Sequence, residues 1–250
     1  TMIAAFDYRR LCQQADAGRQ PRPRLLFVAH QERILKQALA TFRHVLKDFN
    51  FGDLLVGGED GRGSQHLFAS IQSIRSKGLL ETVPPDAFDY VVIDEAHHAE
   101  AETYRRLLEH LRPATLLGLT ATPERADGLD IFQHFGHRPT AEIRLPDAIE
   151  RRLLSPFQYF VISDGTVDLS DVRFTRGRLD AAELSQRFIG NEARATLVMD
   201  KIREICTQPD AIRALGFCAG VQHAVFMAAR FRSYGMEAVA PSGATPKPEG

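Results

Sequence analysis

The sequence predicts an α/β fold in which helices alternate with the strands of a parallel sheet. Three short runs have apolar centres, as expected of strands buried on both faces: RLLFVAH (24–30), FDYVVID (88–94) and TLLGLTATP (115–123). Helical patterns or turns separate these runs, and two of the runs end in clusters of polar side chains. Buried strands that alternate with helices are typical of a parallel α/β sheet.

The first half of the chain supplies most of these elements. Residues 1–18 carry apolar side chains near helical spacing with no capping residue before them, so we expect a piece of a longer protein. After the strand at 24–30, residues 31–49 have the pattern of a helix. Six apolar side chains lie on its predicted inner face: Ile34, Leu35, Ala38, Phe42, Val45 and Leu46. A glycine-rich turn at 57–64 precedes a strand at 66–74 that runs into a helix or turn.

The later part of the chain has a less regular pattern. Pro84 and Pro85 interrupt the chain before the run at 88–94, and a helix is predicted around 100–111. From about residue 146 the sequence becomes polar and shows no clear period. Regular patterns then return, as a helix at 191–206, a strand at 214–221, a helix at 222–235 and another strand from 236. This second run of strand and helix indicates a second α/β domain.

Composition and charge narrow the class of protein. With 250 residues and 44% hydrophobic content, the chain can bury a core and form one or two domains. A formal net charge of −1 argues against a histone-like binder of polyanions but allows a local basic groove. The three cysteines lie far apart, which favours a reducing compartment. We recognise no membrane span or signal peptide, and therefore expect a cytoplasmic protein with no membrane partner.

The run DYVVIDEAHHAE (89–100) leads from a buried strand into two acids and two histidines. In parallel sheets, functional groups gather at the carboxyl ends of the strands, which is where Asp94 and Glu95 are expected. A carboxylate there can hold Mg²⁺, and its neighbour can orient or deprotonate a water for attack on a phosphate. This pattern favours a nucleotide-hydrolysing site.

Two other interpretations of the same run stay open at this point. A metal site could use His97, His98, Glu100 and Glu102. However, consecutive helical side chains point about 100° apart, and the H-E-x-x-H pattern of zinc helices is absent. The run could also be a strand that ends in solvated polar residues without any chemical role.

The residues that end the last of the three apolar runs help to choose between these interpretations. The run TLLGLTATPER (115–125) places Thr120 and Thr122 directly after apolar residues, although such an exit is common in any sheet. Here the sequence resembles the superfamily 2 helicases. VVIDEAHH is similar to their motif II, the DEAH form of the Walker B sequence, and LGLTATP is similar to their motif III.

Other segments carry the same resemblance in the same order along most of residues 1–245. LLFVAHQERILKQA is similar to motif Ia, LFASIQSI to motif Ib and GFCAGVQHAVFMAARF to motif IV, while TPERADGLDIFQHFG is typical of the restriction-subunit-like branch of DEAD/DEAH helicases. The resemblance implies a RecA-like parallel sheet of the P-loop NTPase type. It implies a nearly complete first domain (1–145), a connector (146–205) and the start of a truncated second RecA-like domain (206–250).

The resemblance also implies cofactors and residue roles. ATP and Mg²⁺ would be the cofactors, with Asp94 binding Mg²⁺ and Glu95 positioning the attacking water. His97 would connect this site to Thr120 and Thr122, which would couple hydrolysis to movement. The backbone of the nucleic acid would face His30, Gln31, Ser70 and Gln72. A basic residue is often found where this chain has Gln31.

The chain departs from the family pattern near both ends. No phosphate-binding G-x-x-x-x-G-K-S/T loop occurs, and residues 1–10 resemble the helix that follows this loop. Thr1 would then be the last residue of the loop, with a hydroxyl that binds Mg²⁺. Motif VI with its arginine finger is also missing, so we expect these 250 residues alone to hydrolyse ATP poorly.

The resemblance thus predicts an ATP-dependent helicase or translocase that acts on nucleic acid, with DNA favoured over RNA. The alternative is an α/β scaffold that binds nucleic acid without hydrolysing ATP. Asp94, Glu95 and the two threonines argue against it, because a scaffold has no need of them.

Overall fold

The computed structural model describes residues 1–98, 102–122, 131–175 and 177–241. The chain divides into two compact units, Thr1–Leu154 and Ser155–Gly250. The predicted boundaries at 145 and 205 stay a prediction. None of the helices in the described ranges has the length and apolar character needed to cross a membrane.

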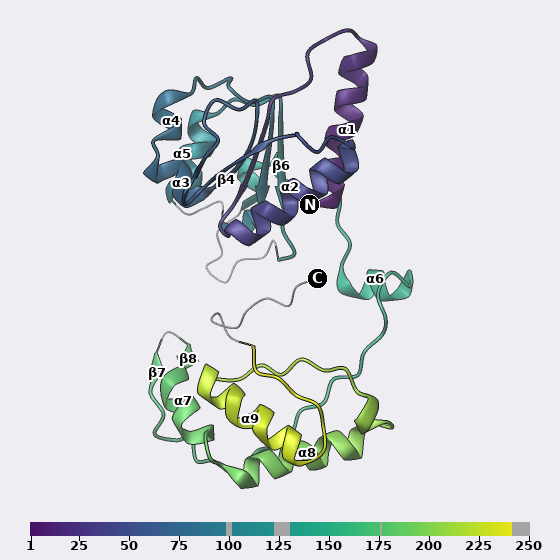
Figure 1. The fold of residues 1–250 in the computed structure, drawn as a ribbon, viewed down its shortest axis with the longest axis vertical. Coiled ribbons are helices and arrows are strands. Elements are labelled where there is room, and N and C mark those ends of the chain that lie inside the picture. The colour runs from purple at the N-terminus through teal and green to yellow at the C-terminus, as the bar shows by residue number, and fades with distance from the viewer. Residues whose placement is uncertain (99–101, 123–130, 176, 242–250) are drawn as a thin grey trace. The chain divides into compact units, whose positions relative to one another are not determined.

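Unit 1 is built on a six-stranded, mostly parallel sheet (Figure 1). In chain order its strands are β1 (Leu25–Ala29), β2 (Asp53–Val56), β3 (Glu59–Asp60), β4 (His66–Ser70), β5 (Tyr90–Asp94) and β6 (Thr115–Leu119). They lie in the order β3-β2-β4-β1-β5-β6, and β3 alone pairs antiparallel, with β2. The predicted α/β fold with a parallel sheet is therefore confirmed.

Helices cover both faces of this sheet (Figure 1). One face carries α1 (Met2–Ala17) and α2 (Glu32–Leu46), which share a buried cluster with β1 and β5. The other face carries α3 (Ile71–Ser76), α4 (Leu79–Thr82) and α5 (Glu102–His110), which share a second cluster with the sheet. Two faces buried in this way explain why the central strands are apolar at nearly every position.

Aromatic rings fill the core between the sheet and helices α1 and α2. The ring centroid of Phe68 in β4 lies 5.6 Å from that of Phe27 in β1 and 5.3 Å from that of Phe42 in α2. Tyr8 in α1 joins them, and its hydroxyl donates to the carbonyl of Pro23 at 2.5 Å. Tilted and stacked rings at these distances add to the free energy of burying their large apolar surfaces.

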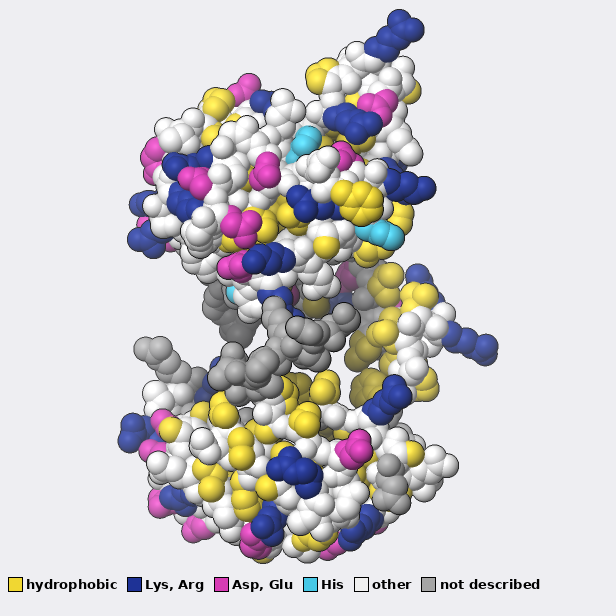
Figure 2. Space-filling model, in the orientation of Figure 1, with side chains coloured by type: hydrophobic (Ala, Val, Ile, Leu, Met, Phe, Trp, Pro, Cys, Tyr) yellow, Lys and Arg dark blue, Asp and Glu magenta, His cyan; other side chains and the backbone are white. Residues whose placement is uncertain are grey.

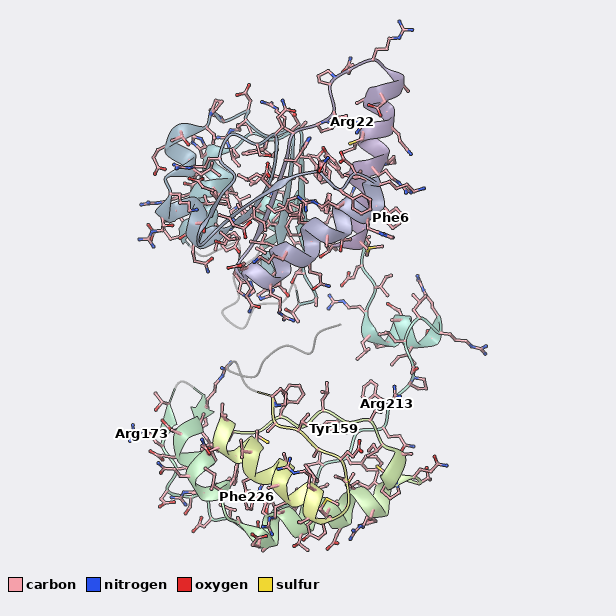
Figure 3. The ribbon with its side chains drawn as sticks, viewed as in Figure 1. Phe6, Arg22, Tyr159, Arg173, Arg213 and Phe226 are labelled. Atoms are coloured by element: carbon pink, nitrogen blue, oxygen red, sulfur yellow. The ribbon has the colours of Figure 1, made fainter. Side chains whose placement is uncertain are left out.

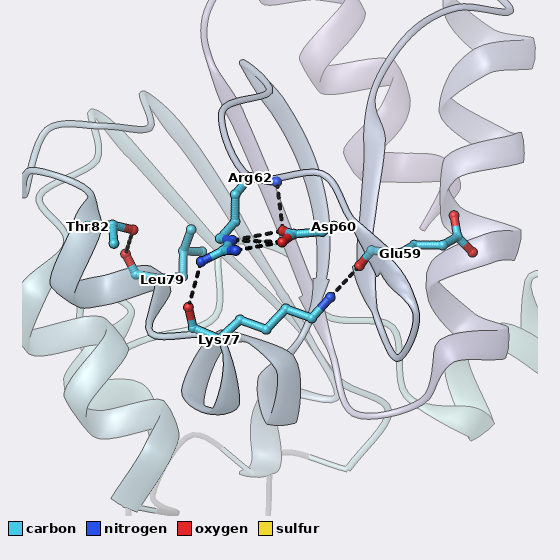
Figure 4. Close-up of polar contacts among 6 residues, drawn as sticks. All are labelled: Glu59, Asp60, Arg62, Lys77, Leu79 and Thr82. Atoms are coloured by element: carbon cyan, nitrogen blue, oxygen red, sulfur yellow. Dashed lines mark hydrogen bonds and ion pairs between the residues drawn. The ribbon is translucent and has the colours of Figure 1, made fainter.

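The antiparallel edge of the sheet is connected to α3 by polar contacts (Figure 4). Arg62, which follows β3, donates to Asp60 at 2.6 and 2.8 Å and to the carbonyl of Lys77 at 3.1 Å. The ammonium group of Lys77 donates to the carbonyl of Glu59 at 2.6 Å. These contacts satisfy backbone acceptors of the edge and of the turn after α3. Because the charged groups are exposed, their ion pair adds little stability.

Two shorter helices complete the described part of unit 1. They are the 3₁₀ turn η2 (Ile131–His134) and the helix α6 (Leu145–Glu150). The structure describes the motif III segment as far as Thr122, and residues 123–130 of the restriction-subunit-like signature (122–136) fall outside the described residues.

The regular elements in the described part of unit 2 are mainly helices. It contains a short hairpin of β7 (Phe174–Thr175) and β8 (Arg178–Leu179), then α7 (Ala181–Phe188), α8 (Glu192–Ile205), η3 (Pro209–Ala211) and α9 (Val221–Ser233). Helices α8 and α9 agree with the helices predicted at 191–206 and 222–235. Helix α7 was missed, although Asp180 caps it by accepting from the backbone N–H groups of Ala182 and Glu183.

The strand predicted at 214–221 is wrong, and residues 236–241 do not form a strand either. The apolar side chains of the first segment are exposed, Leu215 at 89% and Phe217 at 95%. Tyr159, on another extended segment, is 82% exposed (Figure 3). Apolar side chains are also visible across the face of unit 2 in Figure 2. An apolar run forms a strand only beside another strand, and the described residues of unit 2 offer none here.

The aromatic core gives a stability prediction. Phe68→Ala should lower the free energy of unfolding by about 3–5 kcal/mol, because it removes a fully buried ring that the neighbouring rings cannot replace. Urea unfolding of the purified chain measures this value. Phe49→Ala is the matched control, since Phe49 is 80% exposed and its loss should change the value by less than about 0.5 kcal/mol. Equal effects of the two substitutions would contradict this account of the core.

Candidate functional site

Polar residues meet at one edge of unit 1 because four parallel strands end there. Ala29 of β1 pairs with Ser70 of β4, and Asp94 of β5 pairs with Leu119 of β6. Val28 of β1 lies beside Ile93 of β5, so the ends of all four strands are in register. The residues that follow these strands therefore share the carboxyl edge of the sheet, where α/β proteins bind their ligands.

Asp94 and Glu95 occupy the centre of this edge. Asp94 is the last residue of β5 and is half-buried, whereas the four residues before it are buried. Glu95 has a φ of 55°, and its backbone N–H donates to the Asp94 carboxylate at 3.2 Å. A left-handed conformation is unfavourable for a residue with a side chain, and such strain is often found at functional sites. This conformation of Glu95 turns the chain out of the strand directly after Asp94. The carboxylate of Asp94 therefore belongs to the strand end, and that of Glu95 to the turn that follows.

The electrostatic surroundings of Asp94 oppose its negative charge. Burial raises the pKa of this carboxyl above its ordinary value, and the nearby Glu95 raises it further. The backbone N–H of Glu95, which donates to this carboxylate, acts in the opposite direction. Thr1 is also near enough to Asp94 to interact with it electrostatically, so the first residue before α1 lies close to the end of β5. Any cation placed here would stabilise the ionised form of Asp94.

His97 lies between the acids and the end of β6. It belongs to the 3₁₀ turn η1 (Ala96–His98), and its Nδ1 atom is 3.1 Å from the hydroxyl of Thr120 and 3.3 Å from the carboxylate of Glu95. The hydroxyl of Thr120 also accepts the backbone N–H of Thr122 at 3.1 Å. The imidazole of His97 thus connects the end of β5 to the end of β6. Thr120 extends this connection to the backbone of Thr122.

Thr1 stands at the N-cap position of α1. Its backbone carbonyl accepts the N–H of Ala5 at 3.1 Å, while its side chain makes no capping hydrogen bond. The amino end of a helix is favourable for anions because its N–H groups and its dipole face outward. Thr1 is therefore placed near Asp94 at a helix end suited to phosphate.

The four residues predicted to face nucleic acid occupy the ends of β1 and β4. His30 is half-buried after β1, and Gln31 is exposed at the N-cap of α2. Ser70 is buried: its hydroxyl accepts the N–H of Ser73 at 3.0 Å and lies 2.8 Å from the Ser73 hydroxyl. Gln72 is exposed in the first turn of α3. The hydroxyl of Ser70 therefore caps a helix, and the exposed polar groups of this set belong to Gln31 and Gln72.

The alternative metal site is only partly described. Glu100 and the side chain of His98 lie outside the described residues. The Glu102 side chain is 79% exposed and forms an ion pair with Arg106 at 3.2 Å. Within the described part of the chain, no group of three His, Cys, Asp or Glu side chains is arranged to hold a metal ion.

One residue near the acids was missed by sequence reasoning. Tyr104 of α5 is 3% exposed, and its hydroxyl has no hydrogen bond to any described residue. Burial, and then the charges of Asp94 and Glu95, raise the pKa of Tyr104 to about 12. A tyrosine on the inner face of a predicted helix looks like an ordinary core residue, so its sequence position gave no signal.

Comparison with known proteins shows the family to which the chain is similar. A family model described as "Type III restriction enzyme, res subunit" matches residues 1–125. The "Type I restriction enzyme EcoAI endonuclease subunit" of Escherichia coli is 32% identical over 160 residues, which cover 58% of this chain and 20% of that protein. A "51.5 kDa protein" of Lactococcus phage (isolate 7-9) is 24% identical over 229 residues, covering 90% of this chain and 44% of that protein.

Two further proteins are similar to the chain. The "Putative ATP-dependent helicase IRC3" of Saccharomyces cerevisiae is 28% identical over 201 residues, which cover 74% of this chain and 27% of that protein. Among solved structures, the Pyrococcus furiosus Hef helicase domain aligns with a TM-score of 0.43 and 13% identity, covering 85% of this chain and 44% of that one. The chain spans less than half the length of each of these proteins.

Asp94 and Asp89, at the two ends of β5, should make the stability of the protein depend on pH in opposite directions. Because burial raises the pKa of Asp94, the folded protein binds this proton more tightly than the unfolded chain, and stability falls as the pH rises through the folded pKa. Asp94→Asn should therefore raise the melting temperature at pH 7 in EDTA. The gain should disappear below about pH 4, where aspartate is protonated in both states.

Asp89, just before β5, is the matched control. The Arg24 guanidinium donates to it at 2.9 and 3.0 Å and lowers the pKa of Asp89, so this carboxylate contributes stability above its unfolded pKa. That contribution is lost as the pH falls through the folded pKa. Asp89→Asn should lower the melting temperature at pH 7 and have less effect in acid. Shifts of the same sign for both variants at pH 7 would contradict the prediction.

Proposed function

Because the chain belongs to the family of type III restriction enzyme res subunits, we propose that it is part of a superfamily 2 helicase or translocase that hydrolyses ATP. The observation that carries this proposal is the grouping of Asp94, Glu95, His97 and Thr120 at the carboxyl edge of a parallel sheet. Two acids at this edge can hold Mg²⁺ and orient the attacking water, two tasks that phosphoryl transfer to water requires, and the imidazole and the hydroxyl connect them to the next strand. The scaffold alternative gives no reason for this arrangement.

The residues present fit a magnesium ion held together with ATP. Asp94 offers a half-buried carboxylate whose raised pKa shows that its charge is poorly compensated, and oxygen is the ligand that Mg²⁺ prefers. One or two carboxylates leave most of the coordination shell to phosphate oxygens and water. The ion would neutralise charge on the phosphates. We assign a second ligand, the hydroxyl, to Thr1 at the adjacent end of α1.

Glu95 is the residue that we assign to the attacking water. Its carboxylate can orient the water and accept its proton. The contact with His97 at 3.3 Å restricts the orientation of this carboxylate, and the left-handed backbone of Glu95 directs it away from the core. Attack of the water on the γ-phosphorus, cleavage of the bond to the leaving ADP and transfer of the water's proton to Glu95 would then occur at the same edge of the sheet.

His97 and the threonines provide a path from hydrolysis to movement. A change in the charge or position of Glu95 alters what His97 contacts, and His97 contacts Thr120. Thr120 in turn holds the backbone of Thr122, where the chain leaves β6. We assign the exposed residues at the ends of β1 and β4 to the nucleic acid, with DNA as the substrate. Unit 2 would supply the connector and the start of a second RecA-like domain.

The role of Glu95 is tested by nucleic-acid-stimulated phosphate release in the full-length protein. Glu95→Gln keeps the shape of the side chain but cannot accept a proton, so kcat should fall by about 10²- to 10⁴-fold. Glu102→Gln is the matched control, since Glu102 is exposed on α5 and should leave kcat unchanged. Full activity of Glu95→Gln would refute this role.

The residues that precede Thr1 in the full-length protein give a separate and inexpensive test. A Gly-Lys pair directly before Thr1 would support the ATPase and the assignment of the Thr1 hydroxyl. Its absence would support the non-hydrolysing scaffold instead.

The choice of DNA over RNA can be tested by competition binding. Matched DNA and RNA duplexes should displace a labelled DNA duplex from the full-length protein with different efficiencies, the DNA competitor being the more effective. Ionic strength must be equal in both arms, because phosphate contacts make affinity strongly dependent on salt. A clear preference for RNA would overturn the choice.

A further inference from the structure

The hydroxyl of Tyr104 is unusual among the buried tyrosines of unit 1. It is buried and makes no hydrogen bond to any described residue. The other two have partners: Tyr8 donates to the carbonyl of Pro23 at 2.5 Å, and Tyr90 donates to the carboxylate of Asp7 at 2.8 Å. Tyr104 therefore stands apart from residues of the same type and the same degree of burial.

An unpaired buried hydroxyl has a free-energy cost, since it has lost its hydrogen bonds to water. Phenylalanine would fill the same space in the apolar cluster without this cost. Packing alone thus gives no reason for the oxygen atom. A buried polar group left unsatisfied in a native structure calls for an explanation, such as a partner that arrives only in another state.

The surroundings of Tyr104 indicate which partner this is. Tyr104 belongs to the same buried cluster as Ile93 and Ala96, the residues on either side of the Asp94–Glu95 pair. Both carboxylates act on the phenol, Asp94 more strongly than Glu95. The pKa of Tyr104, about 12, keeps the hydroxyl protonated at neutral pH, so it can donate a hydrogen bond.

The carboxylate of Asp94 can accept a further hydrogen bond. The backbone N–H of Glu95 is bonded to one of its two carboxylate oxygens, Oδ1. Carboxylates that bind metal ions are usually held in orientation by additional hydrogen bonds from residues behind them. A phenol buried behind the strand end is well suited to this purpose, because it is neutral and rigid.

We propose that Tyr104 is a positioning residue for magnesium: its hydroxyl donates a hydrogen bond to Asp94, or to a water held by Asp94, when the metal–nucleotide complex is bound. This inference rests on the proposed function. Tyr104 does not contact the substrate or the metal. It fixes the direction in which the Asp94 carboxylate presents its oxygen to the cation.

The test is Tyr104→Phe in the full-length protein, which removes only the oxygen atom. Outer partners of metal ligands typically contribute 10- to 100-fold in metal affinity. The Mg²⁺ concentration that gives half-maximal ATP hydrolysis should therefore rise by about that factor, with little change in the KM for ATP at saturating Mg²⁺. The melting temperature in EDTA should stay the same or rise, because the unpaired hydroxyl is gone.

Tyr90→Phe is the matched control, since it removes the same atom from a buried tyrosine that has a partner. It should lower the melting temperature and leave the Mg²⁺ dependence unchanged. A second readout does not need turnover: electron paramagnetic resonance measures free Mn²⁺ during titration of the protein with a non-hydrolysable ATP analogue. Tyr104→Phe should weaken Mn²⁺ binding by about 10- to 100-fold.

The outcomes separate this inference from the proposed function. If the wild type shows no ATP hydrolysis, the proposed function fails, and the Mn²⁺ titration alone decides the role of Tyr104. Unchanged Mn²⁺ affinity in Tyr104→Phe would overturn the inference whatever the activity. A lower melting temperature without a change in metal affinity would also overturn it, as it would show a purely structural role.

Discussion

The pairing of β5 between β1 and β6 is the constraint on which the rest of unit 1 depends. Tyr90, Val91, Val92 and Ile93 are buried, and the strand is hydrogen-bonded on both sides. A strand buried on both faces cannot carry a charge along its length, because an unpaired charge in an apolar surrounding is very unfavourable. Charge becomes possible only where the strand ends. The position of the Asp94–Glu95 pair is therefore fixed by the extent of the sheet.

This constraint also explains which features could be predicted from the sequence. Apolar runs predicted β1, β5 and β6 closely, and the parallel sheet brings the residues after these strands together. The grouping of His97 with Glu95 and Thr120 follows from that logic. Helix α7 was missed because it is short and follows a polar stretch without a clear period, even though Asp180 and Glu183 have the spacing of a capping box. The run at 214–221 was assigned wrongly, since apolar character alone does not supply a neighbouring strand.

Other features of the site depend on geometry that no sequence pattern reports. The left-handed φ of Glu95 has no signature, because glycine and asparagine are the residues usually expected there. Whether a hydroxyl has a partner depends on packing in three dimensions. Ser70 and Tyr104 illustrate both outcomes: the first is engaged in capping α3, and the second is left unpaired in the core. Residue type and spacing alone would have given no reason to separate them.

Three unfavourable features occur together at the end of β5. Glu95 has a strained backbone, Asp94 keeps a carboxylate where burial opposes its charge, and the hydroxyl of Tyr104 lacks a partner. A bound cation would relieve the second by neutralising the acid, and the third by orienting the Asp94 carboxylate, or a water held by it, as an acceptor for the phenol. Strain and unsatisfied groups at one place lower the stability of the free protein, but they increase the free energy gained on binding. The local instability of this strand end is thus the physical counterpart of its proposed affinity for a metal–nucleotide complex.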